Sequence, residues 1–197
     1  MNILQSIGNT SMIQLRKVAP ANGASIFAKL EWENPTGSVK DRIARYIIEQ
    51  AERRGELKPG SIIVEATSGN TGIGLAMVAA VKGYRIMLAM SESASLERRR
   101  ILQGMGAELL LTPAHLGTDG AIEEVYRLAR EQPDKYFLAD QFNNPVNPAS
   151  HESTCRELWE QTGGQMTMVV ATMGTTGTLM GLYQGLKKIN PAIRVVG

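Results

Sequence analysis

The sequence predicts an α/β protein with two doubly wound domains, each built on a parallel sheet, of which the second is incomplete. Three observations predict this fold class. Apolar runs of strand length alternate with amphipathic runs of helix length, as in strands linked by crossover helices. The strand runs are apolar throughout, which is typical of a sheet covered on both faces. The alternation breaks at an Asn- and Pro-rich loop near residues 140–150 and then resumes.

The first 35 residues predict two short strands. The runs SMIQLRKV and SIFAKLEW are apolar and rich in β-branched residues, and the segment APANGA between them is typical of a turn. A helix is predicted from Ser38, where apolar residues begin to recur at helical spacing. Asp41 stands three residues later, as in a capping box, and Gly55 is the expected end of the helix.

The next segments alternate regularly between strand and helix. Gly83 and Gly106 are expected to close the first two of these helices. The predicted strands are SIIVEA, RIMLAM, AELLLT and YFLAD, and the predicted helices are residues 73–82, 96–105 and 121–132. After the loop QFNNPVNPAS, a helix at 152–162, a strand at 166–172, a helix at 179–189 and a strand at 194–197 are predicted.

Composition limits the classes of partner and the compartment. Hydrophobic residues make up 43 % and charged residues 20 % of the 197 residues, as in ordinary globular proteins. The net charge of +2 gives no electrostatic reason to expect nucleic acid or an anionic membrane. No apolar run approaches the roughly 20 residues of a membrane span, and the N-terminus lacks the features of a signal peptide. We therefore expect a cytoplasmic protein without nucleic-acid or membrane partners.

The cysteine and the arginine cluster give no further candidate for a catalytic or metal site. Cys155 is the single cysteine, so the chain forms no intrachain disulfide and no cysteine-based zinc cluster, and we expect no metal site. Nothing near Cys155 suggests activation, which predicts a helix-packing thiol. The basic cluster at residues 98–100 is interpreted as a solvated helix face or a set of local ion pairs.

Polar loops follow several of the predicted strands, where ligands of parallel sheets bind. The loop TSGNTG, residues 67–72, offers hydroxyl and amide groups at a helix N-terminus and suits a carboxylate or phosphate oxygen. Its glycine spacing is not that of a dinucleotide fingerprint, and no Walker-type loop is present. The loop GTTGT, residues 174–178, forms an anion cradle without a lysine and suits a phosphate monoester. Turn and capping chemistry is the alternative for both loops.

Two further segments carry candidate site residues. Gln141 and Asn143 directly follow a predicted strand, so their amides are candidates for the same cleft, with ordinary loop structure as the alternative. Lys40 lies in the first turn of its predicted helix, where the helix dipole disfavours a cation. Dipole and burial both favour a neutral amine, which forms a Schiff base and shuttles protons. A solvated lysine is the alternative, but an amine, an anion cradle and a carboxylate loop together suit pyridoxal phosphate and an amino acid.

These segments together resemble a known family. PTGSVKDR, EATSGNTGI, ERR, GAEL, DQFNNP and GTTGT, in this order and spacing, resemble the cysteine synthase (O-acetylserine sulfhydrylase) family of fold type II pyridoxal phosphate enzymes, with a leaning toward its B-type branch. The resemblance covers nearly the whole chain. It implies an N-terminal α/β domain at 36–145 that carries the Schiff-base lysine. It also implies that residues 1–35 and 146–197 form part of the second domain, which carries the phosphate loop.

The resemblance also implies the site residues and the reaction. Lys40 corresponds to the residue that forms the internal aldimine and moves the α-proton, and Asn70 to the partner of the ring oxygen of pyridoxal 5'-phosphate. The phosphate loop corresponds to Gly174, Thr175, Thr176, Gly177 and Thr178. The positions that bind the substrate α-carboxylate correspond to Thr67, Ser68, Thr71 and Gln141. The implied reaction is a β-replacement that forms L-cysteine from O-acetyl-L-serine or O-phospho-L-serine and a sulfur donor, through an α-aminoacrylate.

The family resemblance leaves alternatives open. A sibling β-replacement enzyme, such as a cystathionine or 2,3-diaminopropionate synthase, shares these motifs, and so does a truncated, non-catalytic binding paralogue. The family further implies a homodimer and serine acetyltransferase as a partner. Ser91 stands where family members usually carry proline, and Cys155 and Arg156 stand where they carry glycine and proline. The chain corresponds to the first two thirds of a family chain, so the serine that faces the pyridine nitrogen has no counterpart in it.

Overall fold

The computed structural model describes residues 2–19 and 21–197. Met1 and Pro20 lie outside the described residues. Both belong to the predicted second domain, and Pro20 also belongs to the predicted APANGA turn. The strands are β1 (Met12–Gln14), β2 (Phe27–Lys29), β3 (Ile62–Ala66), β4 (Arg85–Ser91), β5 (Glu108–Thr112), β6 (Tyr136–Leu138), β7 (Met168–Val170) and β8 (Arg194–Val196). The α-helices are α1 (Lys40–Arg54), α2 (Asn70–Lys82), α3 (Leu96–Gly104), α4 (Gly117–Glu131), α5 (Val146–Ala149), α6 (Glu152–Gln161) and α7 (Gly177–Ile189). Short 3-10 helices are η1 (Ile3–Ser6), η2 (Glu31–Glu33) and η3 (Ala114–Leu116).

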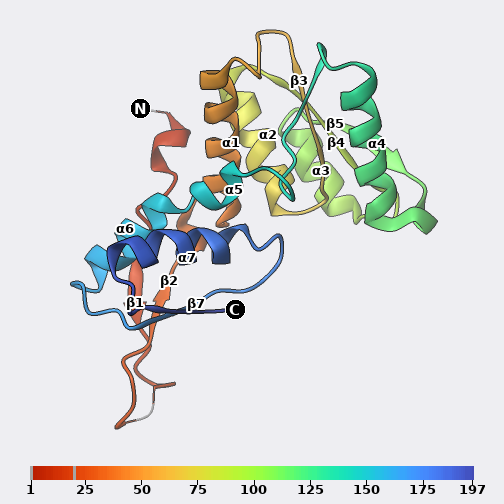
Figure 1. The fold of residues 1–197 in the computed structure, drawn as a ribbon. Helices are drawn as coiled ribbons and strands as arrows, with labels where there is room; N and C mark the ends of the chain where they lie inside the picture. The colour runs from red at the N-terminus through yellow and green to blue at the C-terminus, as the bar shows by residue number, and fades with distance from the viewer. Residues whose placement is uncertain (1, 20) are drawn as a thin grey trace.

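The largest sheet is parallel and confirms the predicted α/β class (Figure 1). Its strand order is β5-β4-β3-β6. The chain steps outward from β3 to β5 and then returns through α4, which places β6 on the free edge of β3. The strand order therefore reverses between β3 and β6. Ligands of open α/β sheets bind at such a reversal, beyond the carboxyl ends of the strands.

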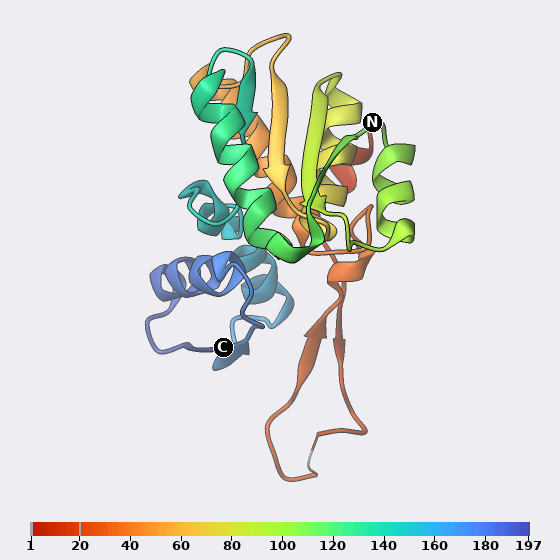
Figure 2. The same ribbon diagram turned by 90° about the vertical axis from the view of Figure 1, so that its right-hand side faces the viewer.

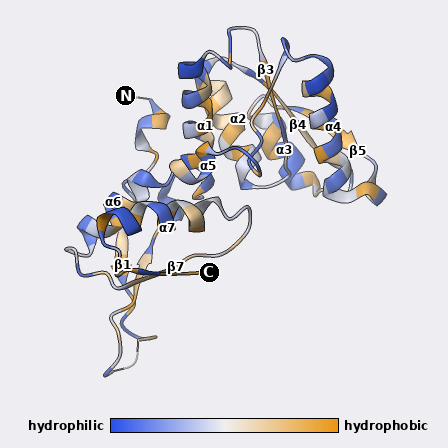
Figure 3. Ribbon diagram, in the orientation of Figure 1, coloured by the Kyte–Doolittle hydropathy of each residue, from blue (hydrophilic) through white to orange (hydrophobic). Residues whose placement is uncertain are grey.

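Helices cover this sheet on both faces, with α4 on one face and α1, α2 and α3 on the other (Figure 2). Side chains of a strand alternate between its faces. Ile62 and Val64 of β3 accordingly pack in the core under α4, whereas Ile63 packs in the core under α1 and α2. Buried apolar residues of these helices, such as Ile47, Leu75 and Val125, pack in these two cores, and Figure 3 shows that apolar residues occur on each helix. Burial on both faces explains why the strand runs are apolar throughout.

A second group of elements lies beside this unit (Figure 1). It holds the parallel pair β7–β8, helices α6 and α7, and the antiparallel β1–β2 hairpin. Helix α7 packs on α5 and α6 through glycines spaced four residues apart. A Cβ on Gly181 would lie 2.3 Å from the carbonyl oxygen of Pro148, and one on Gly185 would lie 2.5 Å from Cys155 Sγ. The close approach of these helices depends on these glycines.

Cys155 is the packing thiol that its sequence context predicts. It is buried between α6 and α7, and burial raises its pKa to about 11. A thiol with such a pKa is protonated at neutral pH and is a poor nucleophile. The large sheet lies within residues 36–145 and the β7–β8 sheet within residues 146–197. The assignment of these parts to two separate domains stays a prediction.

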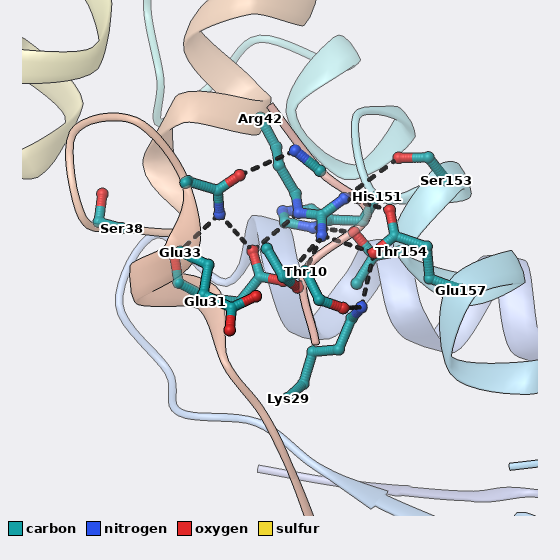
Figure 4. Close-up of polar contacts among 12 residues, drawn as sticks. Thr10, Lys29, Glu31, Glu33, Ser38, Arg42, His151, Ser153, Thr154 and Glu157 are labelled. Carbon is teal, nitrogen blue, oxygen red and sulfur yellow. Dashed lines mark hydrogen bonds and ion pairs between the residues drawn. The ribbon is translucent and has the colours of Figure 1, made fainter. Parts of the chain in front are cut away.

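A buried ion cluster joins the second group of elements to α1 (Figure 4). The Arg42 guanidinium donates to both carboxylate oxygens of Glu31, at 2.7 and 2.8 Å, and to both of Glu157, at 2.7 and 2.8 Å. Lys29 Nζ lies 2.6 Å from the same Glu157 carboxylate. Burial alone raises the pKa of Glu157, but the hydrogen bonds from Arg42 and Lys29 lower it to about 2. The cluster therefore stays ionised at neutral pH.

The predicted capping box at Ser38 is wrong. Helix α1 begins at Lys40, and Val39 occupies the N-cap position without a side-chain bond. The Asp41 carboxylate is fully buried and accepts the N–H of Thr36 at 2.7 Å and the Thr36 hydroxyl. Ser38 Oγ accepts the N–H of Lys40 at 3.2 Å instead. Asp41 fixes the loop before the helix, because the Thr36 donors compete successfully for its carboxylate.

Three other helix boundaries differ from the prediction. Helices α2, α4 and α7 begin three, four and two residues earlier than the apolar periodicity indicates, because their polar first turns belong to the helix. The short helix α5 lies within the predicted loop 141–150, with Pro145 at its N-cap. Proline is tolerated at helix starts, so a proline-rich segment can still form one turn. Gly55 and Gly83 end their helices with positive φ, as predicted, and Gly106 follows α3 with φ +85.

Candidate active site

The candidate site lies where the carboxyl ends of β3 and β6 meet the starts of α1, α2 and α7. Helix α5 lies between α1 and α7 and contacts both (Figure 1). Gly74, in the second turn of α2, packs against the first turn of α1, where a Cβ would lie 3.2 Å from the Lys40 carbonyl oxygen. Helix starts carry backbone N–H groups without helical acceptors and the positive end of the dipole. Their convergence favours an anionic ligand.

Lys40 is the first residue of α1 and is half-buried. Burial lowers the pKa of its amine below the ordinary range for lysine. Burial is the one cause of this shift, so no carboxylate of the described residues offsets it with an opposing charge. A larger share of Lys40 is therefore neutral at a given pH than for a solvated lysine, which makes the amine a better nucleophile and proton acceptor.

The loop at residues 67–72 is held by its own side chains. Thr67 Oγ1 accepts the N–H of Gly69 at 3.2 Å. A Cβ on Gly72 would lie 2.9 Å from Thr67 Cγ2, so a larger residue would displace Thr67. Arg98 Nη1 donates to the carbonyl oxygen of Ser68 at 3.0 Å. Arg98 is exposed, as the interpretation of residues 98–100 as a solvated helix face predicts, and from α3 it also contacts this loop.

A small cavity of about 140 Å³ opens beside the same loop. Thr67 and Ser68 line it on one side, and Ser91, the last residue of β4, and Ser93 line it on another. The hydroxyls of Ser91 and Ser93 lie 2.7 Å apart. Ser91, which stands in place of the usual family proline, thus adds a hydroxyl to this wall. The cavity offers polar groups and room for a small substituent.

Gln141, three residues beyond the end of β6, is fixed from three directions. Thr71 Oγ1 donates to Gln141 Oε1 at 2.7 Å, and Asn147 Nδ2 donates to the Gln141 carbonyl oxygen at 2.7 Å. The backbone N–H of Gln141 donates to Glu65 Oε2 at 3.1 Å. Because the amide oxygen is already used, the side-chain N–H groups of Gln141 are the donors that it can offer to a carboxylate.

Glu65 is a buried acid in the otherwise apolar strand β3. Its side chain also accepts the N–H of Ala66 at 3.0 Å. Burial raises its pKa to about 7, and the negative charge of Asp140 acts in the same direction, while hydrogen bonds from Gln141 and Ala66 oppose the shift. The group therefore titrates near neutral pH, directly beneath Gln141.

The loop at 174–178 leads into the N-terminus of α7. Thr176 adopts the left-handed conformation at φ +61 and occupies the N-cap position without a side-chain capping bond. A Cβ on Gly177 would lie 1.9 Å from Asn147 Oδ1, so only glycine fits this close approach. Thr175 Oγ1 accepts Asn147 Nδ2 at 3.3 Å. The loop contains no acidic residue, and its hydroxyls and free N–H groups suit a phosphate.

His151 supports the last residue of this loop. The imidazole is 1 % exposed, and its Nε2 lies 3.1 Å from Thr178 Oγ1, while Nδ1 lies 3.4 Å from Thr154 Oγ1. Burial lowers the pKa of His151 to about 4, and the positive charges of Arg42 and Lys40 add to the shift. His151 is therefore a neutral partner of Thr178 at physiological pH, close enough to Lys40 to sense its charge.

Hydrogen bonds link three of the predicted site residues. Thr71, Gln141 and Thr175 form one hydrogen-bonded chain through Asn147. Asn70 starts α2 with an exposed side chain. The interpretation of Asn143 as a cleft residue is wrong, because its amide is exposed and donates to the Tyr126 hydroxyl on α4 at 2.7 Å.

Sequence reasoning missed four residues that support the site: Glu65, Arg98, Asn147 and His151. The single acid in an apolar strand run was a signal for Glu65. The other three act through contacts with residues distant in sequence, which spacing does not reveal. In the described part of the chain, no three His, Cys, Asp or Glu residues are arranged to hold a metal ion. Nor does that part contain a helix with the length and apolar character needed to cross a membrane.

Comparison with known proteins identifies close relatives. Cysteine synthase B of Escherichia coli (strain K12) is 47 % identical over 194 residues, which are 98 % of this chain and 63 % of the relative. Cysteine synthase of Staphylococcus aureus (strain Mu50) is 50 % identical over 197 residues, which are 99 % of this chain and 63 % of the relative. The crystal structure of cysteine synthase from Entamoeba histolytica superposes with a TM-score of 0.95 at 46 % identity, covering 98 % of this chain and 59 % of that one.

The match extends over nearly the whole of this chain but over only part of its relatives. The chain spans 63–65 % of the length of the curated relatives that it matches. The sequence model described as "Pyridoxal-phosphate dependent enzyme" matches residues 3–197. Sequence and fold agree on this assignment, and the chain belongs to the family of pyridoxal-phosphate dependent enzymes.

Proposed function

We propose that the protein is a cysteine synthase that replaces the β-acetoxy group of O-acetyl-L-serine with sulfur. The observation that carries the proposal is the hydrogen-bonded chain from Thr71 through Gln141 and Asn147 to Thr175. It joins a carboxylate-type loop to a phosphate-type loop, and α5, which carries Asn147, packs against the helix that begins at Lys40. The sequence similarity to cysteine synthases supports the same reaction.

The residues of the site fit pyridoxal phosphate. The segment 174–178 forms the start of a helix of 13 residues and the loop before it, offers threonine hydroxyls and contains no carboxylate that would repel a phosphate dianion. Gly177 permits the close approach of this loop to Asn147. In this proposal the loop holds the phosphate, Lys40 binds the cofactor and Asn70 contacts its ring oxygen. When bound, the cofactor supplies an electron sink for negative charge at the substrate α-carbon.

Lys40 is the proposed proton carrier. Its burial lowers the pKa of the amine, which favours the neutral form that accepts the α-proton. Position at the N-terminus of α1 acts in the same direction, because the dipole disfavours a cation there. The amine can therefore take the α-proton and return it to the product.

The loop at 67–72 and Gln141 are the proposed carboxylate site. Thr67 and Ser68 border the cavity of about 140 Å³, and Thr71 orients the Gln141 amide so that its N–H groups remain available. The N-terminus of α2 adds free backbone N–H groups. These donors hold the substrate by its carboxylate while the β-substituent occupies the cavity walled by Ser91 and Ser93.

We also propose a cytoplasmic location, a homodimer and serine acetyltransferase as a partner. The single, buried cysteine supports a reducing compartment. The family resemblance is the support for the homodimer and for the partner. Sedimentation of the purified protein, alone and with serine acetyltransferase, tests both associations.

The visible absorption spectrum of the purified protein with pyridoxal phosphate tests the proposal. We expect a cofactor band that changes on addition of O-acetyl-L-serine and returns on addition of sulfide. Borohydride reduction followed by mass spectrometry should place the cofactor on the peptide that contains Lys40. Return of the band with homocysteine or an amine, but not with sulfide, would instead identify a sibling β-replacement enzyme.

Two lysine variants sharpen this experiment. Lys40→Ala should abolish the reducible attachment. Lys82→Ala is the matched control, because Lys82 lies on α2 and pairs with Glu52 at 2.7 Å, away from the site. A wild-type protein without a cofactor band, or equal attachment in wild type and Lys40→Ala, would contradict the proposal.

A further inference from the structure

Asn147 connects the two halves of the site. Its side chain is buried, 4 % exposed, on the single turn of α5 between the loops that follow β6 and β7. The same Nδ2 group donates to the Gln141 carbonyl oxygen at 2.7 Å and to Thr175 Oγ1 at 3.3 Å. The NH₂ group has two hydrogens, so both bonds can form at once.

The backbone on either side holds this amide in place. The N–H of Asn147 donates to the Asn144 carbonyl oxygen at 3.0 Å, and the Asn147 carbonyl oxygen accepts Ser150 Oγ at 2.7 Å. On the other side of the amide, Gly177 approaches so closely that a Cβ there would lie 1.9 Å from Asn147 Oδ1. Movement of α7 would therefore displace the amide, and movement of the amide would displace Gln141.

We propose that Asn147 is a positioning residue that couples the phosphate loop, through Thr175, to the carboxylate-binding residue Gln141. This inference rests on the proposed function for the identity of the two ligands. Asn147 contacts neither ligand in this proposal. It holds the Thr175 hydroxyl toward the phosphate and the Gln141 backbone in the register that presents its side-chain amide.

Affinity for pyridoxal 5'-phosphate, measured by fluorescence titration of the apoprotein, tests the first contact. Asn147→Leu, of similar size but without polar atoms, should weaken binding about three- to tenfold, the range for one lost hydrogen bond. Affinity for pyridoxal, which lacks the phosphate, should change less than about twofold. Asn143→Leu is the matched control, because Asn143 lies in the same loop but its exposed amide donates to the Tyr126 hydroxyl on α4 at 2.7 Å. Equal loss in both variants, or equal loss for both ligands, would overturn the proposal.

A double-mutant cycle separates coupling from general destabilisation. Thr175→Val removes the hydroxyl, and in that background Asn147→Leu should weaken cofactor binding less than about twofold further. If the loss of cofactor affinity in the double variant equals the product of the losses in the two single variants, the link to Thr175 is overturned. Absence of pyridoxal phosphate binding by the wild type would overturn the proposed function and this role with it, whereas equal binding by wild type and variants overturns this role alone.

The second contact is tested with L-alanine, which has an amino-acid carboxylate and no β-leaving group. The cofactor band of the loaded protein reports its binding. Asn147→Leu should raise the dissociation constant for L-alanine about three- to tenfold, whereas Thr175→Val should change it less than about twofold.

Asn147→Asp preserves the size of the side chain and can accept the Thr175 hydroxyl, but it places an oxygen against the Gln141 carbonyl. It should therefore weaken L-alanine binding at least as much as Asn147→Leu, and unchanged L-alanine binding in both variants would overturn the link to Gln141.

Discussion

Glu65→Gln should remove a pH dependence of folding stability that one buried acid creates. Glu65 is 2 % exposed, and burial raises its pKa to about 7. An unfolded chain has an ordinary glutamate pKa of about 4.3, so the folded state binds the proton more tightly between these values. The free energy of unfolding of the wild type therefore falls as pH rises through this window. The full loss, reached well above pH 7, amounts to about 3.7 kcal/mol.

The variant changes the hydrogen bonds as well as the charge. Two backbone N–H groups, of Ala66 and Gln141, donate to the two carboxylate oxygens. A glutamine can accept only one of them and directs its NH₂ group at the other, at a cost of about 1–3 kcal/mol. We therefore expect Glu65→Gln to be less stable than the wild type at pH 5 and to gain about 3 kcal/mol relative to it by pH 8.

Urea unfolding followed by far-ultraviolet circular dichroism at pH 5, 6, 7 and 8 measures this difference. Subtraction of the wild type cancels the groups that the two proteins share. Glu157→Gln is the control, because the pKa of Glu157 is held near 2, so its folded and unfolded pKa values both lie below this pH window. Its difference from the wild type should stay constant with pH. A constant difference for Glu65→Gln would refute the argument that Glu65 titrates in the folded protein.

Three further predictions concern charge and packing. Arg42→Met should lower the free energy of unfolding in urea by about 3–5 kcal/mol, because it leaves two carboxylates without their buried partner, and a loss below 1 kcal/mol would contradict the assigned cluster. Gly185→Ala should lower the free energy of unfolding by about 1–3 kcal/mol, because the new Cβ meets Cys155 Sγ. The double variant Gly185→Ala/Cys155→Ala should recover most of the lost melting temperature, and a double variant without recovery would contradict this contact. Lys40→Met should raise the free energy of unfolding of the apoprotein by about 0.3–1 kcal/mol, since it removes a half-buried cation from a helix N-terminus. A lower melting temperature in Lys40→Met would contradict the argument that burial and the helix dipole disfavour the charged amine.

The sequence was sufficient to predict the large sheet because its strands are buried on both faces. Continuous apolar runs such as SIIVEA and RIMLAM marked β3 and β4, and positive-φ glycines such as Gly55 and Gly83 marked helix ends. These features are local, so a linear pattern records them. The loops at 67–72 and 174–178 were also visible, because glycines and hydroxyl residues before an apolar helix are local features.

The errors arose where two local partners competed or where the partner was distant. Asp41 fits the pattern of a capping box with Ser38, but the donors of Thr36 lie closer in the folded loop. Asn143 and Asn147 are both amides in the same loop, and the sequence could not show that the first would face Tyr126 and the second Gln141. That choice depends on the one-turn helix α5, which the proline-rich sequence concealed.

The first turn of α1 explains how the Lys40 amine stays without an ion pair to any residue that the structure describes. Successive helical residues are rotated by 100°, so Lys40 and Arg42 point to nearly opposite sides. Arg42 is anchored in the buried ion cluster on one side (Figure 4), Asp41 holds the preceding loop through Thr36, and Gly74 of α2 packs against the turn. The backbone is therefore fixed by the neighbours of Lys40, while desolvation alone shifts the pKa of its amine. In the proposed function a rigid turn of this kind suits covalent and proton-transfer chemistry, because the amine must leave one partner for another without moving the helix.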